Sequence, residues 1–515
     1  MRMLGVGRAK LVNRVIFWTG SMNTHFDVAI VGAGPAGLFT AYELALLSPN
    51  LSIAIIDIGK KSIKRKCPLV NSKICPTCDL CDIVHGVGGA GMYSDGKLSA
   101  FPAGSGLAST LGRTEYAQGL SDYVYGIFEK KFIGQAPKIT KASTSGSREL
   151  NETLDSAGLS LKTYDVMHVG SEGIQEFCAE LEQHLAQRGV TFLYKHQVKE
   201  VHQVDGYFEI EGTVGEMQFL YDAQSVVMAT GKASGRFLRN LLDQLNVAYS
   251  FNQIEMGVRV EARADALTCF TSSHLDAKIK LRSDSEEVRS FCMCTGGYLA
   301  KCFYDSYLPD NKICTISGYS LRDRKSENSN FGILVRKAFK EHEDPINAQL
   351  PFIEKINDLP GFTAVQRLED FFASRATTMD QLLANSVKST LDESAPVNLK
   401  EFLPDYVVRG IEHFIRKLGK VSPHLAHRDT LLHAPVWELC WDRVSTTSNL
   451  ETSVEGFYVI GDALGVARGI IQGGMTGVVV ARTIVSKRAC QGRSQNNIQI
   501  QETEGSLSNS MVSCL

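Results

Sequence analysis

The sequence predicts an α/β protein in which a Rossmann-like nucleotide-binding lobe is interrupted by a mixed α+β domain. An apolar stretch at 26–31 is followed by the glycine-rich run 32–37 and a helical pattern, the order of the βα unit that opens such a lobe. A strand, a glycine-rich turn and a helix close the chain at 456–485. Because 515 residues exceed what one hydrophobic core usually serves, we expect the intervening chain to form a second domain.

The order of these patterns also suggests segment boundaries. We expect an extension at 1–24, nucleotide-binding segments at 25–110, 166–235 and 431–487, an insertion at 111–165, a substrate or cap domain at 236–430, and a disordered tail at 488–515. The basic stretch 1–21 is interpreted either as a targeting segment or as the product of an upstream start, with Met22 as the natural first residue.

Composition argues against two classes of partner. The formal net charge is −2 and basic residues are not gathered on one stripe, so we expect no nucleic-acid partner. No apolar run approaches the ~20 residues that a spanning helix needs, so we expect no membrane span. The 13 cysteines without a convincing secretory signal favour a reducing compartment, and we expect a cytoplasmic protein.

The glycine-rich run 32–37 predicts a dinucleotide site. Its glycines permit a tight turn and let the backbone approach a pyrophosphate at the N-terminus of the helix. Asp57 ends the next predicted strand, where a carboxylate can accept hydrogen bonds from ribose hydroxyls. The alternative is a tight βα turn without a ligand, but strand, helix and acid occur together here.

Distant motifs favour FAD as the dinucleotide. Gly461-Asp462 resembles the second flavin motif of FAD-dependent oxidoreductases, in which an aspartate contacts the ribityl chain and the next helix points its positive end at the flavin. The run 229–231 resembles the third signature of that superfamily. The run 86–91 stands where related flavoproteins place a loop over the pyrophosphate. The residues that we expect to bind FAD are Gly32, Gly34, Pro35, Ala36, Gly37, Asp57, Gly88, Gly89, Ala90, Gly91, Ser94, Val198, Ala229, Thr230, Gly231, Gly461, Asp462, Gly469 and Ile470.

The segment 236–430 contains no second strand–glycine–helix fingerprint. A bound NADPH is therefore disfavoured. We expect a small organic substrate, or an electron-transfer partner, to reach the flavin directly. NAD(P)H as a diffusible co-substrate is the alternative.

Motifs along the chain resemble one family. They include IVGAGPAGLF at 30–39, GGAGMYSDGKL at 88–98, MGVRVE at 256–261, FCMCTGGYL at 291–299 and GDALGVARGIIQGG at 461–474. Together they resemble a little-characterised family of FAD-dependent dehydrogenases with a glutathione-reductase-type flavin lobe. The resemblance extends from residue 26 to about 485 and implies FAD binding and an oxidoreductase, without implying a substrate.

Four cations are candidates for roles in flavin chemistry. Lys97 and Arg468 could stabilise the reduced, anionic flavin, with a surface or phosphate-pairing role as the alternative. Arg259 and Arg322 could hold an acidic substrate, because arginine suits bidentate carboxylate binding, or form salt bridges within the second domain. Three histidines are candidate acid–base groups, although most isolated histidines are not: His168, His424 and His427.

A dense group of thiols precedes the second glycine run: Cys67, Cys75, Cys78 and Cys81. The C-x2-C-x2-C spacing of the last three resembles the start of an iron–sulfur ligand run, and zinc is the other candidate metal. A thiol–disulfide relay and packed thiols without a cofactor are the alternatives. Cys292 and Cys294 alternate along a predicted strand, so we expect them to face opposite sides and not to form a shared dithiol.

These observations predict an FAD-dependent oxidoreductase, a dehydrogenase or reductase that transfers hydride between the flavin and a small organic substrate. A flavin monooxygenase or halogenase of the same superfamily is one alternative. A non-enzymatic binding protein on the same fold is another. Such proteins have lost flavin contacts, whereas this chain retains the run 32–37, Asp57 and Gly461-Asp462. The sequence does not indicate an oligomeric state.

Overall fold

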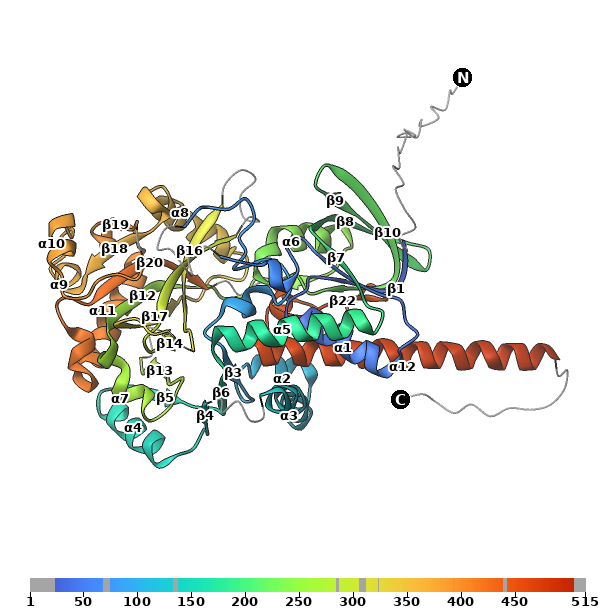
Figure 1. The fold of residues 1–515 in the computed structure, drawn as a ribbon, viewed down its shortest axis with the longest axis horizontal. Helices are drawn as coiled ribbons and strands as arrows, with labels where there is room; N and C mark the ends of the chain where they lie inside the picture. Colours follow the sequence, from blue (N-terminus) through green and yellow to red (C-terminus); the bar gives the residue numbers. More distant parts are fainter. Residues whose placement is uncertain are drawn as a thin grey trace, which may run out of the picture.

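The computed structural model describes residues 24–67, 75–132, 138–283, 287–304, 312–322, 324–391, 393–438 and 442–503. In this part of the chain, a seven-stranded sheet and an eight-stranded sheet form the centres of two lobes that lie side by side (Figure 1). The long helix α12 (Ile470–Thr503) runs along the first lobe and projects beyond it (Figure 1).

The first sheet has the order β7-β2-β1-β10-β9-β8, and β22 pairs with β10. The strands β7, β2, β1, β10 and β22 are parallel, whereas β8, β9 and β10 form an antiparallel meander. Parallel strands are covered on both faces, which explains the unbroken apolar run 28–31. The strands are β1 (His25–Val31), β2 (Ile53–Asp57), β7 (Thr191–Tyr194), β8 (His196–Val204), β9 (Tyr207–Val214), β10 (Met217–Met228) and β22 (Phe457–Val459).

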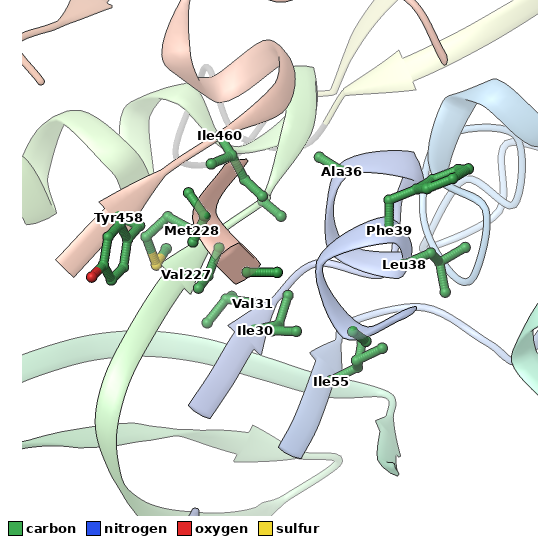
Figure 2. Packing of buried hydrophobic residues seen from close by; sticks show 14 of the residues in the cluster. Ile30, Val31, Ala36, Leu38, Phe39, Ile55, Val227, Met228, Tyr458 and Ile460 are labelled. Atoms are coloured by element: carbon green, nitrogen blue, oxygen red, sulfur yellow. The ribbon is translucent and has the colours of Figure 1, made fainter. Parts of the chain in front are cut away.

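The helices α1 (Pro35–Leu47), α3 (Thr114–Lys131), α5 (Gly170–Gln187) and α12 pack against one another in the first lobe. Figure 2 shows Ile30 of β1, Met228 of β10 and Phe39 of α1 in the buried cluster of this lobe. A Cβ at Gly477 of α12 would lie 2.4 Å from the backbone oxygen of Ala36, so glycine permits the close approach of α12 to α1. This packing fixes the N-terminus of α1 at the carboxyl end of β1.

The second sheet is antiparallel apart from the β18–β19 pair, and helix α11 (Asp405–Val421) covers one of its faces. Val288 and Val335 lie opposite each other on adjacent strands and both approach α11 at Gly410. Because side chains alternate along a strand, their neighbours Arg289 and Arg336 lie on the other face. The strands in order are β19 (Ala395–Pro396), β18 (Ala364–Arg367), β20 (Leu431–Glu438), β12 (Glu255–Arg263), β17 (Asn328–Arg336), β14 (Glu287–Cys294), β13 (Lys278–Leu281) and β5 (Leu159–Lys162).

Smaller sheets and helices complete the described chain. The short strands are β3 (Lys97–Ser99), β6 (Val166–His168) and β4 (Lys138–Thr140) in one sheet, β15 (Tyr298–Tyr304) and β16 (Ile313–Tyr319) in a second, and β11 (Tyr249–Ser250) and β21 (Arg443–Val444) in a third. The further α-helices are α2 (Gly106–Leu111), α4 (Ser145–Ser156), α6 (Gly235–Gln244), α7 (Thr268–Thr271), α8 (Pro345–Asn357), α9 (Leu368–Phe372) and α10 (Met379–Ala384).

The predicted segment boundaries differ from the structure in three places. The segment 431–487 begins too early, because β20 pairs with both β12 and β18 inside the second sheet. The predicted insertion 111–165 is divided between the lobes: α3 packs into the first core, whereas β5 forms an edge of the second sheet. Helix α6 lies within the predicted cap domain, yet Leu241 and Leu242 pack into the first core.

The C-terminal prediction is also wrong in part, because α12 extends into the predicted disordered tail as far as Thr503. Two ion pairs hold this helix to the first lobe: Lys487 Nζ lies 2.7 Å from Glu451 Oε2, and Arg488 Nη2 lies 2.7 Å from Asp27 Oδ1. The predicted extension lies outside the described residues, apart from Thr24. Among the residues that the structure describes, no helix is both long and apolar enough to cross a membrane.

Candidate functional site

The turn between β1 and α1 leaves no space for side chains. Gly32 has φ +109°, and a Cβ on it would lie 2.3 Å from the backbone oxygen of Ala229. A Cβ on Gly37 would lie 2.0 Å from the backbone oxygen of Gly32. The turn therefore requires glycine at position 32 because of the backbone conformation and at position 37 because of close packing.

The three predicted glycine segments converge at the start of α1. A Cβ on Gly89 would lie 3.0 Å from Gly34 Cα, and one on Gly461 would lie 2.9 Å from Ala36 Cβ. The segments meet at a cavity of about 960 Å³ between the two lobes, within the usual size range of a cofactor pocket. Every residue that we expect to bind FAD lines this cavity except Gly37 and Gly88, which lie behind its wall.

Asp57 fixes the backbone of this wall. Its Oδ2 accepts a hydrogen bond from the Ala33 amide at 2.8 Å, and its Oδ1 accepts one from the Gly59 amide at 2.7 Å. The carboxylate therefore joins the end of β2 to the glycine turn. A role in binding ribose stays a prediction.

Two observations test whether the wall suits a dinucleotide. Thr230 Oγ1 is buried on the cavity side of the protein and has no hydrogen-bond partner among the described residues. A buried hydroxyl without a partner costs free energy, so a ligand that bonds to it would remove that cost. Helix α1 begins at Pro35 with no capping side chain in the described chain, which leaves its positive end available to an anion. These residues fit the cofactor.

Asp462 lies at the same wall beside an ion pair between Lys232 and Glu438. Burial raises the pKa of Asp462 to about 6; Lys232 opposes the shift, and the Glu438 carboxylate adds to it. The carboxyl group is therefore poorly stabilised as an anion, and hydroxyl groups of a ligand would supply the missing hydrogen bonds.

The opposite wall is the face of the second sheet that α11 does not cover. At its centre, Glu255 is 1% exposed and contacts three guanidinium groups. Arg289 Nε lies 2.8 Å from Oε1, Arg336 Nη2 lies 3.0 Å from Oε1, and Arg468 Nη1 lies 3.5 Å from Oε2. Burial alone would raise the pKa of Glu255, but the guanidinium groups hold it at about 2. Glu287 also pairs with Arg336, and the Glu438 carboxylate acts on Arg289 and Arg468, but the cations at this wall of the cavity outnumber the carboxylates.

Lys97 lines the cavity within a buried network of ionised groups. Its Nζ lies 3.2 Å from Asp95 Oδ2 and 3.5 Å from Asp276 Oδ1, and it donates to the backbone oxygen of Met293. Lys278 Nζ pairs with the other oxygen of Asp276 at 2.8 Å. Burial would lower the pKa of Lys97, but Asp95 and Asp276 raise it, so the ammonium group stays charged.

Arg259 and Arg322, the predicted substrate clamp, do not line the cavity. Arg259 is buried between strands, where its Nε donates to Asn330 Oδ1 at 2.9 Å. Alternation along β12 directs the side chain into the packing beside the sheet, and the absence of a side chain at Gly318 leaves room for it. Arg322 is half exposed, and its Nη2 lies 3.2 Å from Glu176 Oε1. The structure thus brings Lys97 and Arg468 to the cavity but not these two arginines.

The candidate histidines do not line the cavity either. His168 Nε2 lies 2.9 Å from the backbone oxygen of Asp95, and burial, reinforced by Lys97, lowers its pKa to about 4. It is therefore neutral near pH 7. His424 and His427 are exposed at the end of α11 and beyond it.

The cysteine group 67–81 does not assemble into a ligand set. In the described part of the chain, no cluster of three metal-ligating side chains within 4.8 Å includes any of the four thiols. Cys67, Cys75 and Cys81 pack against the core of the second lobe, whereas Cys78 is exposed. Burial raises the pKa of the Cys75 and Cys81 thiols. This geometry favours the packed-thiol interpretation over the metal site.

Cys292 and Cys294 contradict the prediction that they face opposite sides, because their sulfurs lie 3.8 Å apart. The strand pairing of β14 with β17 shifts register between Phe291 and Cys294, and Cys292 has φ +47°. A bulge of this kind interrupts the alternation of side chains. The rule of alternation failed because it assumes a regular strand.

Sequence reasoning missed most residues of the charged wall, the wall of the cavity that lies opposite the glycine turn. Among its residues, Arg289 and Lys278 had no recognisable motif, whereas Asp95 stands inside the glycine motif 88–98 that was used for FAD. The signal for Asp95 was a charged residue at the edge of a glycine-rich run. The others depend on contacts between strands that are far apart in the sequence.

Comparison with known sequences gives a family match for the second lobe. Residues 253–436 match the family described as "FAD-dependent protein, C-terminal domain-like". The match extends from β12 into β20 and supports FAD dependence. An uncharacterized protein of Clostridium beijerinckii is 24% identical over 486 residues, which cover 89% of this chain and 80% of that protein.

Solved flavoprotein structures are more distant. A quinol fumarate reductase variant of E. coli is 13% identical with a TM-score of 0.40, covering 91% of this chain and 71% of that one. A flavoprotein/dehydrogenase of Cytophaga hutchinsonii is 11% identical with a TM-score of 0.41, covering 90% and 79%. A flavin-dependent halogenase is 13% identical with a TM-score of 0.43, covering 91% and 59%. Likenesses of this degree do not distinguish one flavin reaction from another.

Proposed function

We propose that this chain is an FAD-dependent oxidoreductase, a dehydrogenase or reductase that transfers hydride between the flavin and a small organic substrate. The observation that carries the proposal is the convergence of three glycine segments on one cavity whose opposite wall is positively charged. The family match at 253–436 supports FAD.

The glycine wall would hold the cofactor. The turn 32–37 and the start of α1 suit the pyrophosphate, Asp57 the ribose, and Asp462 the ribityl hydroxyls. Thr230 Oγ1 would gain a hydrogen-bond partner. When bound, FAD supplies the two-electron hydride chemistry, and the protein supplies binding, orientation and electrostatics.

Arg468 is the better of the two predicted cations for stabilising a reduced, anionic flavin. The charge of Lys97 is already balanced by Asp95 and Asp276. Arg468, in contrast, shares Glu255 with two other guanidinium groups, and the Glu438 carboxylate that also acts on it is paired with Lys232. The shared carboxylates leave positive charge that would favour an anion in the cavity.

We propose an anionic substrate, because two further lysines line the same wall. Lys162 of β5 lies directly opposite Lys278 of β13, and Lys280 follows two residues later on the same face. Within the described residues, neither Lys162 nor Lys280 has an ion pair, whereas Lys278 is paired with Asp276. A bound carboxylate would supply a partner for these two lysines.

The test of FAD binding is the absorbance of the purified full-length chain. We expect a flavin spectrum as purified or after reconstitution with FAD, and the cofactor released by denaturation should be FAD. Protein that stays colourless after reconstitution would overturn the proposal and favour a binding protein on this fold.

The reaction is tested by anaerobic reduction of the bound flavin against a panel of metabolites and NAD(P)H. We expect a carboxylic acid to bleach the flavin, and Lys280→Gln to raise the substrate concentration needed by about tenfold. Lys420→Gln, which changes a lysine remote from the cavity, should have no effect. Reduction by NAD(P)H alone, followed by oxygen-dependent hydroxylation or halogenation, would instead establish the monooxygenase alternative.

A further inference from the structure

The bulge in β14 creates a pair of neighbouring thiols beside the cavity. Cys292 Sγ and Cys294 Sγ are 3.8 Å apart, and Cys292 lines the cavity whereas Cys294 is 1% exposed behind it. A disulfide requires the two sulfurs to approach to about 2.05 Å, so the pair closes by a further movement of its side chains. The pair has one member accessible to a small molecule and one that is sheltered.

A buried arginine contacts the sheltered sulfur. Arg259 Nη2 lies 3.4 Å from Cys294 Sγ and donates to the backbone oxygen of Cys292 at 2.8 Å. Its Nε is held by Asn330 Oδ1. The side chain is 1% exposed, and a Cβ at Gly318 would lie 1.9 Å from Nη2, so the guanidinium group has a fixed place.

The buried guanidinium group of Arg259 needs an anion nearby to balance its charge. Its hydrogen-bond partners in the described structure are an amide oxygen, a backbone carbonyl and a thiol, and none is a carboxylate. The Asp95 carboxylate also acts on Arg259, but it is already paired with Lys97. A thiolate at Cys294 would supply a negative charge in direct contact with the guanidinium group. Consistent with this, the hydrogen bond from Cys292, followed by the Arg259 charge, lowers the pKa of Cys294 against the opposing effect of burial.

Cys292 has the opposite environment. Its thiol donates to Asp95 Oδ2 at 2.9 Å, and the hydrogen bond with Cys294, together with burial, raises its pKa. Of the two sulfurs, the sheltered Cys294 therefore has the lowered pKa and is the one favoured as the thiolate.

We propose that Cys292 and Cys294 form a dithiol–disulfide couple on the cavity wall that exchanges with a small disulfide. The proton of Cys292 passes to the neighbouring Cys294 sulfur, and the Cys292 thiolate attacks one sulfur of the disulfide; an S–S bond forms to Cys292, the original S–S bond breaks, and the departing thiolate takes the proton from Cys294. The Cys294 thiolate then attacks Cys292 Sγ and releases the second half of the disulfide as a thiolate. The protein dithiol is oxidised by two electrons, and one disulfide is reduced to two thiols.

A metal ion is the competing interpretation, because Asp95, Cys292 and Cys294 each place a ligand atom within 4.8 Å of the others. Two cations already contact these ligands, however: Arg259 at Cys294 and Lys97 at Asp95. Their positive charges oppose the binding of a further cation, so the geometry favours thiol chemistry.

The couple is tested on the full-length protein equilibrated with reduced and oxidised glutathione at a series of ratios. Free thiols are then blocked, and the tryptic peptide Ser290–Lys301, which contains Cys292 and Cys294 as its only cysteines, is weighed. We expect reversible conversion between a doubly blocked peptide and an unblocked peptide lighter than the dithiol form by two hydrogen atoms. This readout does not require bound FAD, so it is independent of the proposed oxidoreductase activity.

Variants make the test specific. Cys292→Ser should abolish the disulfide, and Cys269→Ser, which changes an exposed thiol elsewhere, should leave the midpoint unchanged. In Arg259→Gln the dithiol form loses the cation that stabilises it, so the ratio of oxidised to reduced glutathione at the midpoint should fall about tenfold. Arg259→Lys should reverse part of this change. Three results would overturn the proposal: thiols that stay free at every ratio, a glutathione adduct on Cys292 that is not resolved, or protection of both thiols by a bound metal.

Discussion

The two walls of the cavity use different parts of the polypeptide. The wall from the first sheet consists of backbone, and its decisive residues are glycines whose missing side chains let three segments meet. The opposite wall, formed by the second sheet and the neighbouring strand β3, consists of ionised side chains, many of them in ion pairs, such as Lys97 with Asp95 and Asp276. A side chain added to the first wall clashes with backbone atoms at one place. Removal of a charged group from the second wall leaves its partner charge unpaired in a poorly solvated site.

The largest effect is expected from Lys97→Met in the charged wall. It leaves Asp95 and Asp276 buried with less positive charge, so the free energy of unfolding should fall by about 3–5 kcal/mol. Urea denaturation measures this loss. As a control, Lys131→Met removes an ion pair with Glu180 at the surface and should cost about 0–1 kcal/mol. Equal losses in the two variants would contradict the expectation that burial makes the ion pairs of Lys97 more important for stability than a surface pair.

The next effect concerns Asp462 and pH. Its pKa of about 6 in the folded protein lies above its usual value, so the folded state binds this proton more tightly than the unfolded state. The resulting stability is fully present below pH ~4 and is lost as pH rises through about 6, which amounts to up to about 3 kcal/mol. In the FAD-free protein, Asp462→Asn should remove this pH dependence and raise the melting temperature at pH 7. Identical pH profiles for the two proteins would contradict the assignment.

A smaller effect is expected from Gly32→Ala in the backbone wall. The new Cβ meets the backbone oxygen of Ala229 and the positive φ is unfavourable, so we expect a loss of about 1–3 kcal/mol and at least a tenfold fall in FAD affinity. Thermal unfolding and flavin titration measure the two changes. Gly206→Ala is the matched control, because it also has positive φ but open space around its Cβ position. Its FAD affinity should be unchanged.

The smallest effect is expected from Asp57→Asn, which keeps the shape of the side chain but removes its charge. The change weakens the hydrogen bonds to the Ala33 and Gly59 amides and should cost about 1 kcal/mol, with a further loss of FAD affinity measured by titration. Asp27→Asn is the control, because Asp27 similarly accepts from the Ser52 amide but lies outside the cavity lining. A similar fall in FAD affinity in both variants would show that Asp57 acts only through stability.

The cysteines show where prediction from sequence succeeds and fails. The spacing of Cys75, Cys78 and Cys81 suggested a metal site, yet the described chain directs Cys81 into a core and leaves Cys78 exposed. The spacing of Cys292 and Cys294 argued against a pair, yet a bulge brings their sulfurs together. Spacing predicts side-chain direction only where the backbone is regular, and neither segment meets that condition.

The sequence by itself determined the glycine wall. A strand, a glycine turn and a helix are local features, and each of the three segments carries its own signature, so their meeting at one cavity could be expected before the structure was known. Only the tertiary structure decided the charged wall and the Cys292–Cys294 pair. Glu255, Arg289 and Arg468 are neighbours because strands far apart in the sequence pair in one register and the C-terminal turn lies against them. No periodicity within a short stretch of chain encodes that proximity.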